Sequence, residues 1–316
     1  MEAIIIKEFG GVEKLQLTTV PTPKPTDNEV LIEIHDSGVN PVDWKIREGL
    51  LKSRLPHEFP LILGWEAAGR VDAIGKKVKN FKVGDEVYAY CRKPTVKEGT
   101  YAEYICLDAQ NVALKPKSLS YAQAASIPLA GLTAWQSLFD SANLQKGETV
   151  LIHAGAGGVG GFAIQFAKNA GATVYTTAGQ ENHDYVKKLG ADEAIDYKKE
   201  NFASKMKTLC PKGVDVIFDT VGGKTFHDSL ALLKPGGRIV SLLEHLEPAD
   251  AAKRNIKASY VFVSPNAMQL KQIGDLINKG KVKTPKIEEI PLNQAAEALE
   301  KIRKGHTCGK IVLKVK

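Results

Sequence analysis

The sequence predicts an α/β protein with two domains: a β-rich domain with a barrel-like or sandwich arrangement, and a doubly wound domain built on a parallel sheet. The chain has 316 residues, about twice the length of a common single domain. In its first third, short strand-like runs are separated by Gly and Pro, as in small β domains. From about Ser118 onward, apolar strand-like runs alternate with helical patterns, which is typical of a parallel sheet covered by helices.

The β-rich part contains four predicted strands. Residues Glu29–Asp36 alternate between apolar and polar side chains, with Val30, Ile32 and Ile34 on one face. The other predicted strands are Ala3–Ile6, Glu66–Ile74 and Glu86–Tyr90, and the connection between the first two strands contains Pro21, Pro23 and Pro25. We expect the segment Asn40–Gly49 to be a short loop.

The doubly wound part contains five predicted strands with helices between several of them. The strands are Thr149–Ala154, Thr173–Ala178, Val214–Thr220, Arg238–Leu243 and Ser259–Val263. The clearest helical patterns are Val159–Asn169 and His183–Leu189. Nearly continuous apolar strands are expected where both faces of a parallel sheet are covered.

The C-terminal part returns to mixed structure. After Pro265 we expect a helix, a strand near Ile287–Pro291, a helix near Asn293–Lys304 and a final strand at Lys310–Val315. The longest uncharged segment, Ser118–Phe139, approaches the length of a membrane span. Polar residues and a proline interrupt it, so we interpret it as a buried segment of a soluble protein.

Composition excludes several classes of protein. Four scattered cysteines cannot form a disulfide-dense scaffold or a four-Cys zinc knot. The first residues lack the pattern of a secretory signal, and together these points indicate a reducing, cytoplasmic location. The net charge is +7, but no basic stripe interleaved with aromatic residues appears, which argues against nucleic acid as a partner.

One glycine motif carries the main functional signal. The stretch AGAGGVG contains Gly155-x-Gly157-x-x-Gly160 directly between a predicted strand and a predicted helix. In a βαβ unit, these glycines permit a tight turn, approach of the backbone to a pyrophosphate, and close packing of the helix on the strand. The free N–H groups at the start of the helix favour phosphate. The predicted phosphate loop comprises Gly155, Ala156, Gly157, Gly158, Val159 and Gly160.

The end of the second strand of this unit favours NADPH over NADH. An NAD site usually has Asp or Glu there to bind the ribose 2′-OH. Residues 175–180 contain no carboxylate, so a 2′-phosphate would not be repelled. Candidate donors to that phosphate are Thr177, Gln180, His183 and Tyr197.

The motifs occur in the order found in the medium-chain dehydrogenase/reductase superfamily, and the chain resembles its zinc-free quinone oxidoreductase (zeta-crystallin-like) branch. Nearly the whole chain is covered; the pieces include SGVNPVDWKIREG at 37–49, PLILGWEAAGRV at 60–71, IPLAGLTAWQSL at 127–138, AGAGGVG at 154–160 and GKIVLKV at 309–315. The resemblance implies a GroES-like β catalytic domain at residues 1–122, completed by 265–316. It also implies a Rossmann NADP-binding domain at 123–264, with the active site in the cleft between the two domains.

Departures from the zinc-dependent relatives predict that no metal is bound. Those relatives have a Cys ligand where this chain has Asn40, and a His ligand where it has Trp65. A Trp side chain offers no lone pair to zinc, and an Asn amide is a poor donor. The hydride acceptor must then be electrophilic by itself, as quinones and α,β-unsaturated carbonyls are.

The resemblance also implies roles for residues outside the glycine loop. It places Asn40 near the nicotinamide or the acceptor oxygen, and Asp43 near the active site, where fixing the loop is an alternative role. It places Thr133 beside the nicotinamide ribose, Val221 and Leu243 along the adenosine and nicotinamide side, and Lys310 near the phosphates. Tyr88 and Tyr101 could donate to an oxyanion, although packing is the simpler role for aromatic residues in β strands.

Three functions remain open from the sequence. The first is an NADPH-dependent quinone reductase, the second an NADPH-dependent reductase of C=C bonds in enones, alkenals or enoyl thioesters, and the third a non-catalytic NADPH-binding or structural protein. The resemblance further implies a homodimer, or a tetramer, paired through the Rossmann sheet edge near Ser259–Val263.

Overall fold

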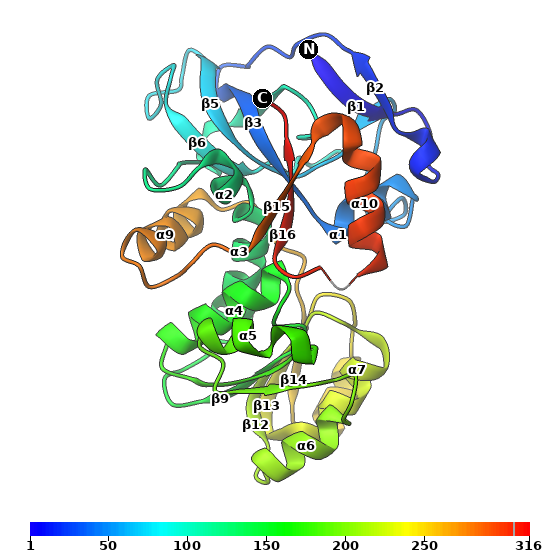
Figure 1. Cartoon of the computed structure of the whole chain (residues 1–316), viewed down its shortest axis with the longest axis vertical. Helices are drawn as coiled ribbons and strands as arrows, with labels where there is room; N and C mark the ends of the chain where they lie inside the picture. Colours follow the sequence, from blue (N-terminus) through cyan, green and yellow to red (C-terminus); the bar gives the residue numbers. More distant parts are fainter. Residues whose placement is uncertain (306) are drawn as a thin grey trace. The chain divides into compact units, whose positions relative to one another are not determined.

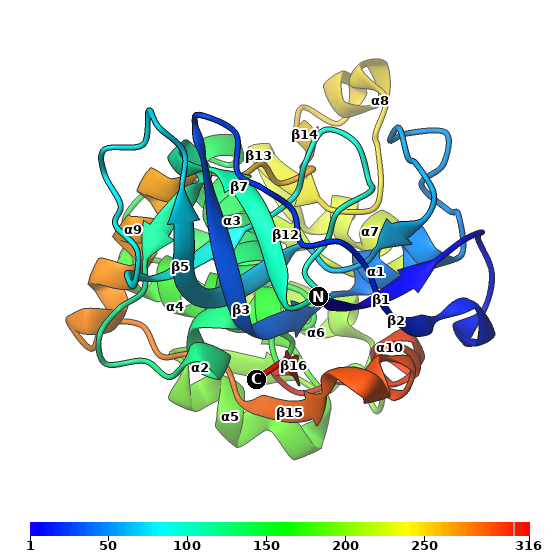
Figure 2. The same ribbon diagram turned by 90° about the horizontal axis from the view of Figure 1, so that it is seen from above.

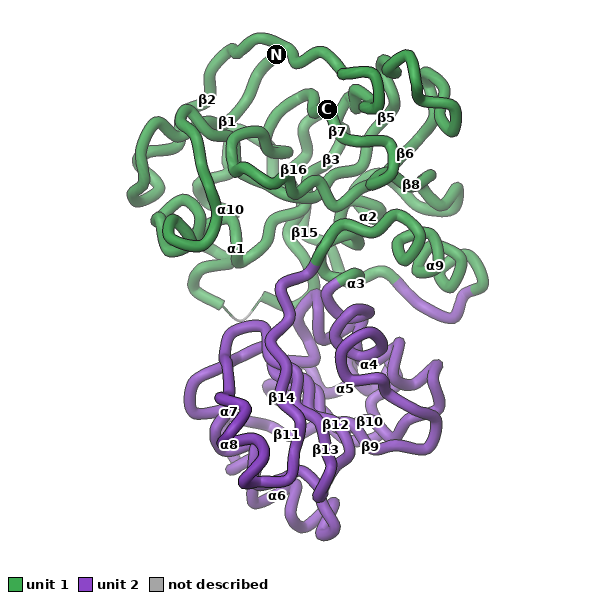
Figure 3. Tube along the Cα trace, turned by 180° about the vertical axis from the view of Figure 1, so that it is seen from behind, with its two compact units in different colours: residues 1–132, 264–279, 284–316 green, residues 133–263, 280–283 purple. Residues whose placement is uncertain are grey.

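The chain forms two compact units, coloured separately in Figure 3. The computed structural model describes residues 1–305 and 307–316. Unit 1 comprises Met1–Leu132, Ser264–Lys279 and Thr284–Lys316, and unit 2 comprises Thr133–Val263 and Gly280–Lys283. Unit 1 continues to Leu132, ten residues beyond the boundary at residue 122 that the resemblance implied. Helix α2 (Tyr121–Ala125) accounts for part of this extension, because it packs against strands β3 and β5 of unit 1.

Unit 1 is built around a seven-stranded sheet in the order β15-β16-β3-β5-β6-β8, with β7 paired to β3. Its strands are β3 (Glu29–Val39), β5 (Glu66–Ile74), β6 (Glu86–Tyr90), β7 (Tyr104–Asp108), β8 (Val112–Leu114), β15 (Ile287–Pro291) and β16 (Lys310–Lys314). Figure 2 shows the long strand β3 between β5 and β7. The C-terminal strand β16 runs antiparallel to β3, so distant parts of the sequence complete one sheet.

The alternation in β3 gives the core of this sheet. Val30, Ile32 and Ile34, which the alternation placed on one face, are buried and belong to one cluster with Val71 and Ile105 from neighbouring strands. A second, three-stranded sheet has the order β2-β1-β4, formed by β1 (Glu2–Ile6), β2 (Gln16–Thr19) and β4 (Leu61–Ile62). Besides α2, this unit contains the helices α1 (Pro41–Arg47), α9 (Ala267–Asn278) and α10 (Ala295–Lys304).

The prediction of a loop at Asn40–Gly49 was wrong, because most of this segment is helical. Residues Pro41–Arg47 form helix α1, with Pro41 in its first turn. The carboxylate of Asp43 accepts a hydrogen bond of 2.8 Å from the backbone N–H of Asn40, which fixes the start of the helix. Proline has a suitable φ at this position and lacks an N–H that would be unpaired there. Both signals lie in the sequence Asn40-Pro41-Val42-Asp43.

Unit 2 is a doubly wound parallel sheet, as predicted. Its strands are β9 (Thr149–Ile152), β10 (Thr173–Thr177), β11 (Glu193–Ile195), β12 (Val214–Asp219), β13 (Leu233–Ser241) and β14 (Lys257–Tyr260). They lie in the order β11-β10-β9-β12-β13-β14, which is the 3-2-1-4-5-6 order of a dinucleotide-binding fold. Its helices, several of them labelled in Figure 1, are α4 (Gly158–Asn169), α5 (His183–Lys188), α6 (Phe202–Leu209), α7 (Gly223–Ser229) and α8 (Pro248–Lys253).

The uncharged segment Ser118–Phe139 divides into several short elements. It includes α2, the helix α3 (Pro128–Trp135) and the beginning of a π-helix at Gln136–Ser141. Within the described part of the chain, no helix has both the length and the apolar character needed to cross a membrane.

Candidate functional site

The predicted phosphate loop connects β9 to α4 in unit 2. Helix α4 begins at Gly158, with Gly157 at its N-cap position. Among the residues that the structure describes, no side chain forms a capping hydrogen bond at this end. The first N–H groups of a helix have no partner within the helix, and they carry the positive end of its dipole. The start of α4 can therefore bind an anionic group.

The three glycines of the motif are in different environments. A Cβ atom added to Gly155 would lie 2.1 Å from the Thr176 hydroxyl, and one added to Gly160 would lie 2.3 Å from the Ala154 carbonyl oxygen. At Gly157, by contrast, the nearest described atom is the Ala154 carbonyl oxygen, at 3.4 Å. The protein's own packing thus requires glycine at the first and third positions. At the second position it leaves an open cradle, which suits the close approach of a pyrophosphate.

A chain of buried hydrogen bonds holds the residues just before this loop in place. The Ser229 hydroxyl donates to the Thr225 carbonyl at 2.6 Å and lies 2.8 Å from His153 Nε2, so Nε2 carries the proton and donates to Ser229. Burial lowers the pKa of His153 to about 4, which keeps its ring neutral. His153 Nδ1 therefore accepts the Thr177 hydroxyl proton over 3.2 Å. His153 is wholly buried and has a structural role just after β9.

In this structure the Thr177 hydroxyl is engaged within the protein, in contrast to the role in binding a 2′-phosphate that the sequence suggested. Its only hydroxyl proton is directed to His153, and its oxygen accepts the Ala154 backbone N–H at 3.1 Å. The side chain is buried, with 4% relative exposure. The threonine fixes the glycine loop to the end of β10 and has no hydroxyl proton left for a 2′-phosphate. The signal in the sequence, a Thr at a strand end, did not distinguish these two roles.

Most of the other predicted residues of unit 2 lie near strand ends, whereas Thr133 lies in helix α3. His183 Nε2 is 3.2 Å from the Ala178 carbonyl oxygen, just beyond β10. Gln180 begins a short 3-10 turn, and the Tyr197 side chain, just beyond β11, is exposed. Val221 and Leu243 follow β12 and β13 and are also exposed. Ala156 and Thr133 are buried.

The turns that present Val221 and Leu243 share one buried carboxylate. Asp219 accepts backbone hydrogen bonds from Val221 and Gly222, both at 3.0 Å, and a hydroxyl hydrogen bond from Ser241 at 2.7 Å. Ser241 in turn accepts the backbone N–H of Leu243 at 3.1 Å. The exposed side chains of Val221 and Leu243 are thus held on fixed turns at neighbouring strand ends.

In unit 1, Asn40 is held by a buried ion pair. Asn40 Nδ2 donates to Glu66 Oε1 at 2.8 Å, and Lys310 Nζ donates to Asn40 Oδ1 at 2.6 Å. Lys310 also donates to Glu66 Oε1 at 2.5 Å, and both side chains are almost wholly buried. Because Lys310 can only donate and Glu66 accepts here, the orientation of the Asn40 amide is determined. Among the described residues one Nδ2 proton of Asn40 has no acceptor, so it can be donated to another group.

The partners of Lys310 differ from those implied by the resemblance. The three protons of its ammonium are directed to Asn40, Glu66 and the Val39 carbonyl oxygen, the last at 3.0 Å. Burial and this full set of acceptors leave no proton for a phosphate. The other carboxylate oxygen of Glu66 accepts the backbone N–H of Leu129 at 2.7 Å, so the same carboxylate holds the start of α3.

Asp43 contacts the backbone of Asn40 and is wholly buried. Its Oδ2 accepts from the Asn40 backbone N–H at 2.8 Å and from the Tyr101 hydroxyl at 3.0 Å. Burial raises the pKa of Asp43 to about 7, although these two hydrogen bonds oppose the rise. The contacts assign Asp43 and Tyr101 to holding the Asn40 backbone. The Tyr88 hydroxyl likewise has a structural partner, the Leu270 carbonyl oxygen at 2.7 Å.

Glu66 belongs to this network but was not among the site residues predicted from the sequence. A signal was present, because a carboxylate stands at the start of a strand whose next residues, Ala67 and Ala68, are small and apolar. Across the described residues, no cluster of three or more His, Cys, Asp or Glu side chains is arranged to hold a metal ion.

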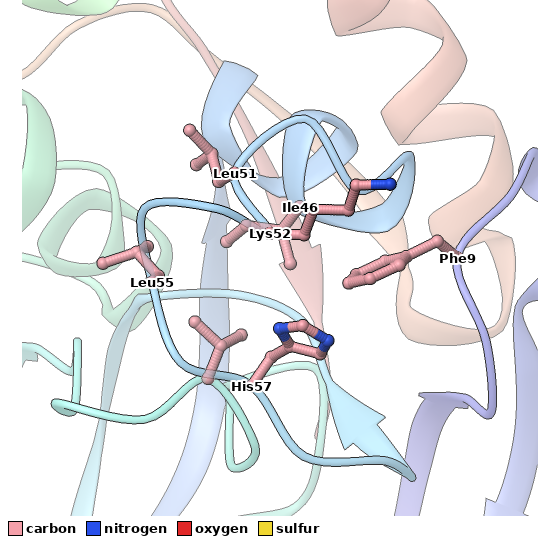
Figure 4. Close-up of a pocket in the computed structure, with 7 residues that line it drawn as sticks. Phe9, Ile46, Leu51, Lys52, Leu55 and His57 are labelled. Atoms are coloured by element: carbon pink, nitrogen blue, oxygen red, sulfur yellow. The ribbon is translucent and has the colours of Figure 1, made fainter.

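A small pocket elsewhere in unit 1 does not have the size of a substrate site. Figure 4 shows Phe9 and His57 on one side of it and Leu51 and Leu55 on the other. Its volume is about 10 Å³, room for about one water molecule. The Phe9 and His57 rings, 4.7 Å apart, pack together beside it.

Known proteins match the chain over its whole length. The protein-family model described as "Alcohol dehydrogenase GroES-like domain" matches residues 26–117, and the family model described as "Zinc-binding dehydrogenase" matches residues 189–313. The quinone oxidoreductase of Mus musculus is 36% identical, over 99% of this chain and 97% of its own. The chloroplastic NADPH-dependent alkenal/one oxidoreductase of Arabidopsis thaliana is 35% identical, over 99% of this chain and 79% of its own.

A solved structure matches equally completely. The Escherichia coli quinone oxidoreductase complexed with NADPH is 29% identical, with a TM-score of 0.90 over 100% of both chains. The GroES-like and Rossmann folds expected from the sequence are confirmed by these matches.

Proposed function

Because this chain belongs to the quinone oxidoreductase branch of the medium-chain dehydrogenase/reductase family, we propose that it is an NADPH-dependent reductase of quinones. The observation that carries the proposal is the open cradle at Gly157, at the start of α4 and at the position of the pyrophosphate in a dinucleotide-binding fold. In the reaction, NADPH and one proton convert a quinone to a hydroquinone and NADP⁺.

The residues of unit 2 would bind and orient the cofactor. The backbone of Gly157, Gly158 and Val159 would approach the phosphates at the start of α4, and Val221 and Leu243 would contact the rest of the dinucleotide. Bound NADPH supplies the hydride. The protein contributes mainly position, because holding the donor against the acceptor replaces an improbable encounter with a fixed geometry.

Asn40 is our candidate to stabilise the acceptor oxygen. Its amide is held by Glu66 and Lys310, and one Nδ2 proton remains for a carbonyl oxygen that gains negative charge. A donor fixed in advance needs little reorganisation when that charge develops. Asp43 and Lys310 would then act through Asn40 as positioning residues, and not on substrate or phosphate directly.

A panel of acceptors tests the proposed function. We expect NADPH consumption with ortho- and para-quinones, measured at 340 nm, and slower consumption with NADH. Gly157→Asp should abolish turnover while the folded state persists. Turnover of none of these quinones by a protein that binds NADPH would contradict quinone reduction.

The alternative is reduction of C=C bonds, favoured by the 35% identity to an alkenal/one oxidoreductase. The same Asn40 donor suits an enone oxygen as well as a quinone oxygen, because both gain charge when hydride is added in conjugation. Enones, alkenals and crotonyl thioesters therefore belong in the same panel. A higher kcat/KM for alkenals than for quinones would favour this alternative.

Two further proposals concern the assembly and the metal. We propose a homodimer paired through β14, since this strand ends the sheet of unit 2 and is paired on one side by β13. Light scattering that gives a monomeric mass would contradict it.

We also propose zinc-independent activity, since Asn40 and Trp65 replace the usual ligands. Tightly bound zinc at one equivalent in metal analysis would contradict that proposal.

A further inference from the structure

An ion pair occupies the edge of unit 2 where a dinucleotide-binding fold receives the adenosine ribose. Lys198 Nζ donates to Glu181 Oε1 at 2.6 Å, and both side chains are about half exposed. Glu181 lies in the turn Gln180–Asn182 after β10, and Lys198 lies in the turn after β11. Neither residue is among the candidates predicted from the sequence: Glu181 lies one position beyond residues 175–180, and Lys198 lies in a separate connection.

The backbone places this pair beside the phosphate loop. The N–H of Gly155 donates to the Thr177 carbonyl at 3.0 Å, which joins the loop to the end of β10. Strands β10 and β11 run in parallel with Thr177 opposite Ile195, so their carboxyl ends are adjacent. The buried side chain of Asp196 accepts the Lys198 N–H at 3.1 Å and fixes the turn that carries this lysine.

The Glu181 carboxylate is close to the end of β10. A Cβ atom added to Gly179 would lie 2.5 Å from Glu181 Oε1, so the carboxylate covers this glycine. In dinucleotide-binding folds, an acidic group at the end of the second strand accepts the ribose 2′-OH, whereas a basic group nearby accommodates a 2′-phosphate. This edge offers both groups, and they neutralise each other when no cofactor is bound.

Such a pair can be separated at little cost. Exposed ion pairs contribute little to stability, because water solvates the separated charges almost as well. A 2′-phosphate carries more negative charge than one carboxylate and offers several acceptor oxygens, so it can replace Glu181 as the partner of Lys198. Glu181 must then move away, or its charge opposes the phosphate.

We propose that Lys198 is the principal side chain that binds the 2′-phosphate of NADPH, and that Glu181 lowers this affinity by competing for the same ammonium. This inference rests on the proposed function and adds a determinant of cofactor choice. Without Lys198 the preference for the phosphorylated cofactor is lost. Without the charge of Glu181 the preference increases.

The test measures binding of two adenosine fragments by calorimetry, without turnover. Adenosine 2′,5′-bisphosphate carries the 2′-phosphate, and adenosine 5′-monophosphate lacks it. We expect Lys198→Met to weaken binding of the bisphosphate by about 10- to 100-fold, as for loss of a charged hydrogen bond, with little change for the monophosphate. Glu181→Gln should strengthen bisphosphate binding by about 3-fold or more.

A second ion pair of unit 2 provides the matched control. Lys205 Nζ lies 3.7 Å from Glu200 Oε2. The side chains of this pair are about as exposed as those of Lys198 and Glu181. Lys205→Met removes the same charge from the same unit and should leave both affinities unchanged. All the substituted side chains are exposed, and far-ultraviolet circular dichroism verifies that the variants are folded.

Three outcomes would overturn the inference. If Lys198→Met leaves bisphosphate affinity unchanged, or weakens both fragments equally, Lys198 does not bind the 2′-phosphate. If Lys205→Met has an equal effect, general charge and not this position sets the affinity. Any of these outcomes, in a protein whose unaltered form binds NADPH, refutes the role of Lys198 and leaves the proposed function standing. If the unaltered protein does not bind NADPH at all, the proposed function is refuted as well.

Discussion

The buried pair of Lys310 and Glu66 allows a quantitative prediction for Lys310→Met. The substitution keeps a long apolar side chain but removes an ammonium that donates to Glu66, Asn40 and the Val39 carbonyl. Relative exposure of the two charged side chains is 4% and 0%, so water cannot solvate the carboxylate that remains. Breaking a buried pair in this way costs about 3–5 kcal/mol, well above the 0–1 kcal/mol of an exposed pair.

An exposed pair in the same unit is the control. Lys301 contacts Glu288 at 2.5 Å, but both side chains are 46% exposed, so Lys301→Met should cost at most about 1 kcal/mol. The assay is urea unfolding followed by tryptophan fluorescence, because Trp44 and Trp65 report on unit 1. The double variant Glu66→Gln/Lys310→Met should be more stable than the sum of the single effects, because it leaves no unpaired charge.

Equal losses in the free energy of unfolding for Lys310→Met and Lys301→Met would refute this reasoning. Water would then reach Glu66 in spite of its burial. Loss of quinone turnover alone would not separate this explanation from a catalytic one. The free energy of unfolding and kcat must therefore be measured on the same variants.

Three further predictions follow from the geometry. Gly157→Ala should leave the melting temperature nearly unchanged and weaken NADPH binding, since its Cβ would be 3.4 Å from the nearest described protein atom; equal loss of stability and binding would contradict an open cradle. Burial, with the negative charge of Glu289 added, raises the pKa of Asp36 to about 7, so the folded protein retains a proton that the unfolded chain loses near pH 4. The stability of the unaltered protein relative to Asp36→Asn should therefore fall from about pH 4 to about pH 7 and change little above that; urea unfolding at several pH values tests this, and a constant difference would contradict it. Tyr101→Phe removes a buried hydrogen bond of 3.0 Å to Asp43 and should cost about 1–3 kcal/mol in urea unfolding, whereas a loss of kcat without loss of stability would indicate contact with substrate.

Sequence patterns were most reliable where the structure depends on neighbouring residues. The predicted strands Glu66–Ile74 and Glu86–Tyr90 coincide with β5 and β6, and the predicted helix Val159–Asn169 differs from α4 by one residue. Other boundaries shifted where pairing between strands decides the length. Strand β13 begins at Leu233, five residues before its predicted start, because Val214 of β12 pairs with it there across a register shift.

Site residues were harder to assign, because the role of a polar side chain depends on what it contacts. Thr177 stands at the expected strand end, yet its hydroxyl proton is directed inward to His153. Glu181 lies one residue beyond residues 175–180, where an NAD site usually has a carboxylate, and its ion pair with Lys198 was not predicted. The register of β10 and β11 brings these two charges together, and no local pattern encodes that register.

By itself, the sequence determined the parallel sheet with its glycine loop, since the spacing of Gly155, Gly157 and Gly160 and the apolar runs beside them act over a few neighbouring positions. Only the tertiary structure decided which charges are paired. Lys310 and Glu66 lie 244 positions apart and meet because β16 and β5 both pair with β3. A charge removed from water is stable only beside a partner, and that partner is set by the folding of the whole sheet.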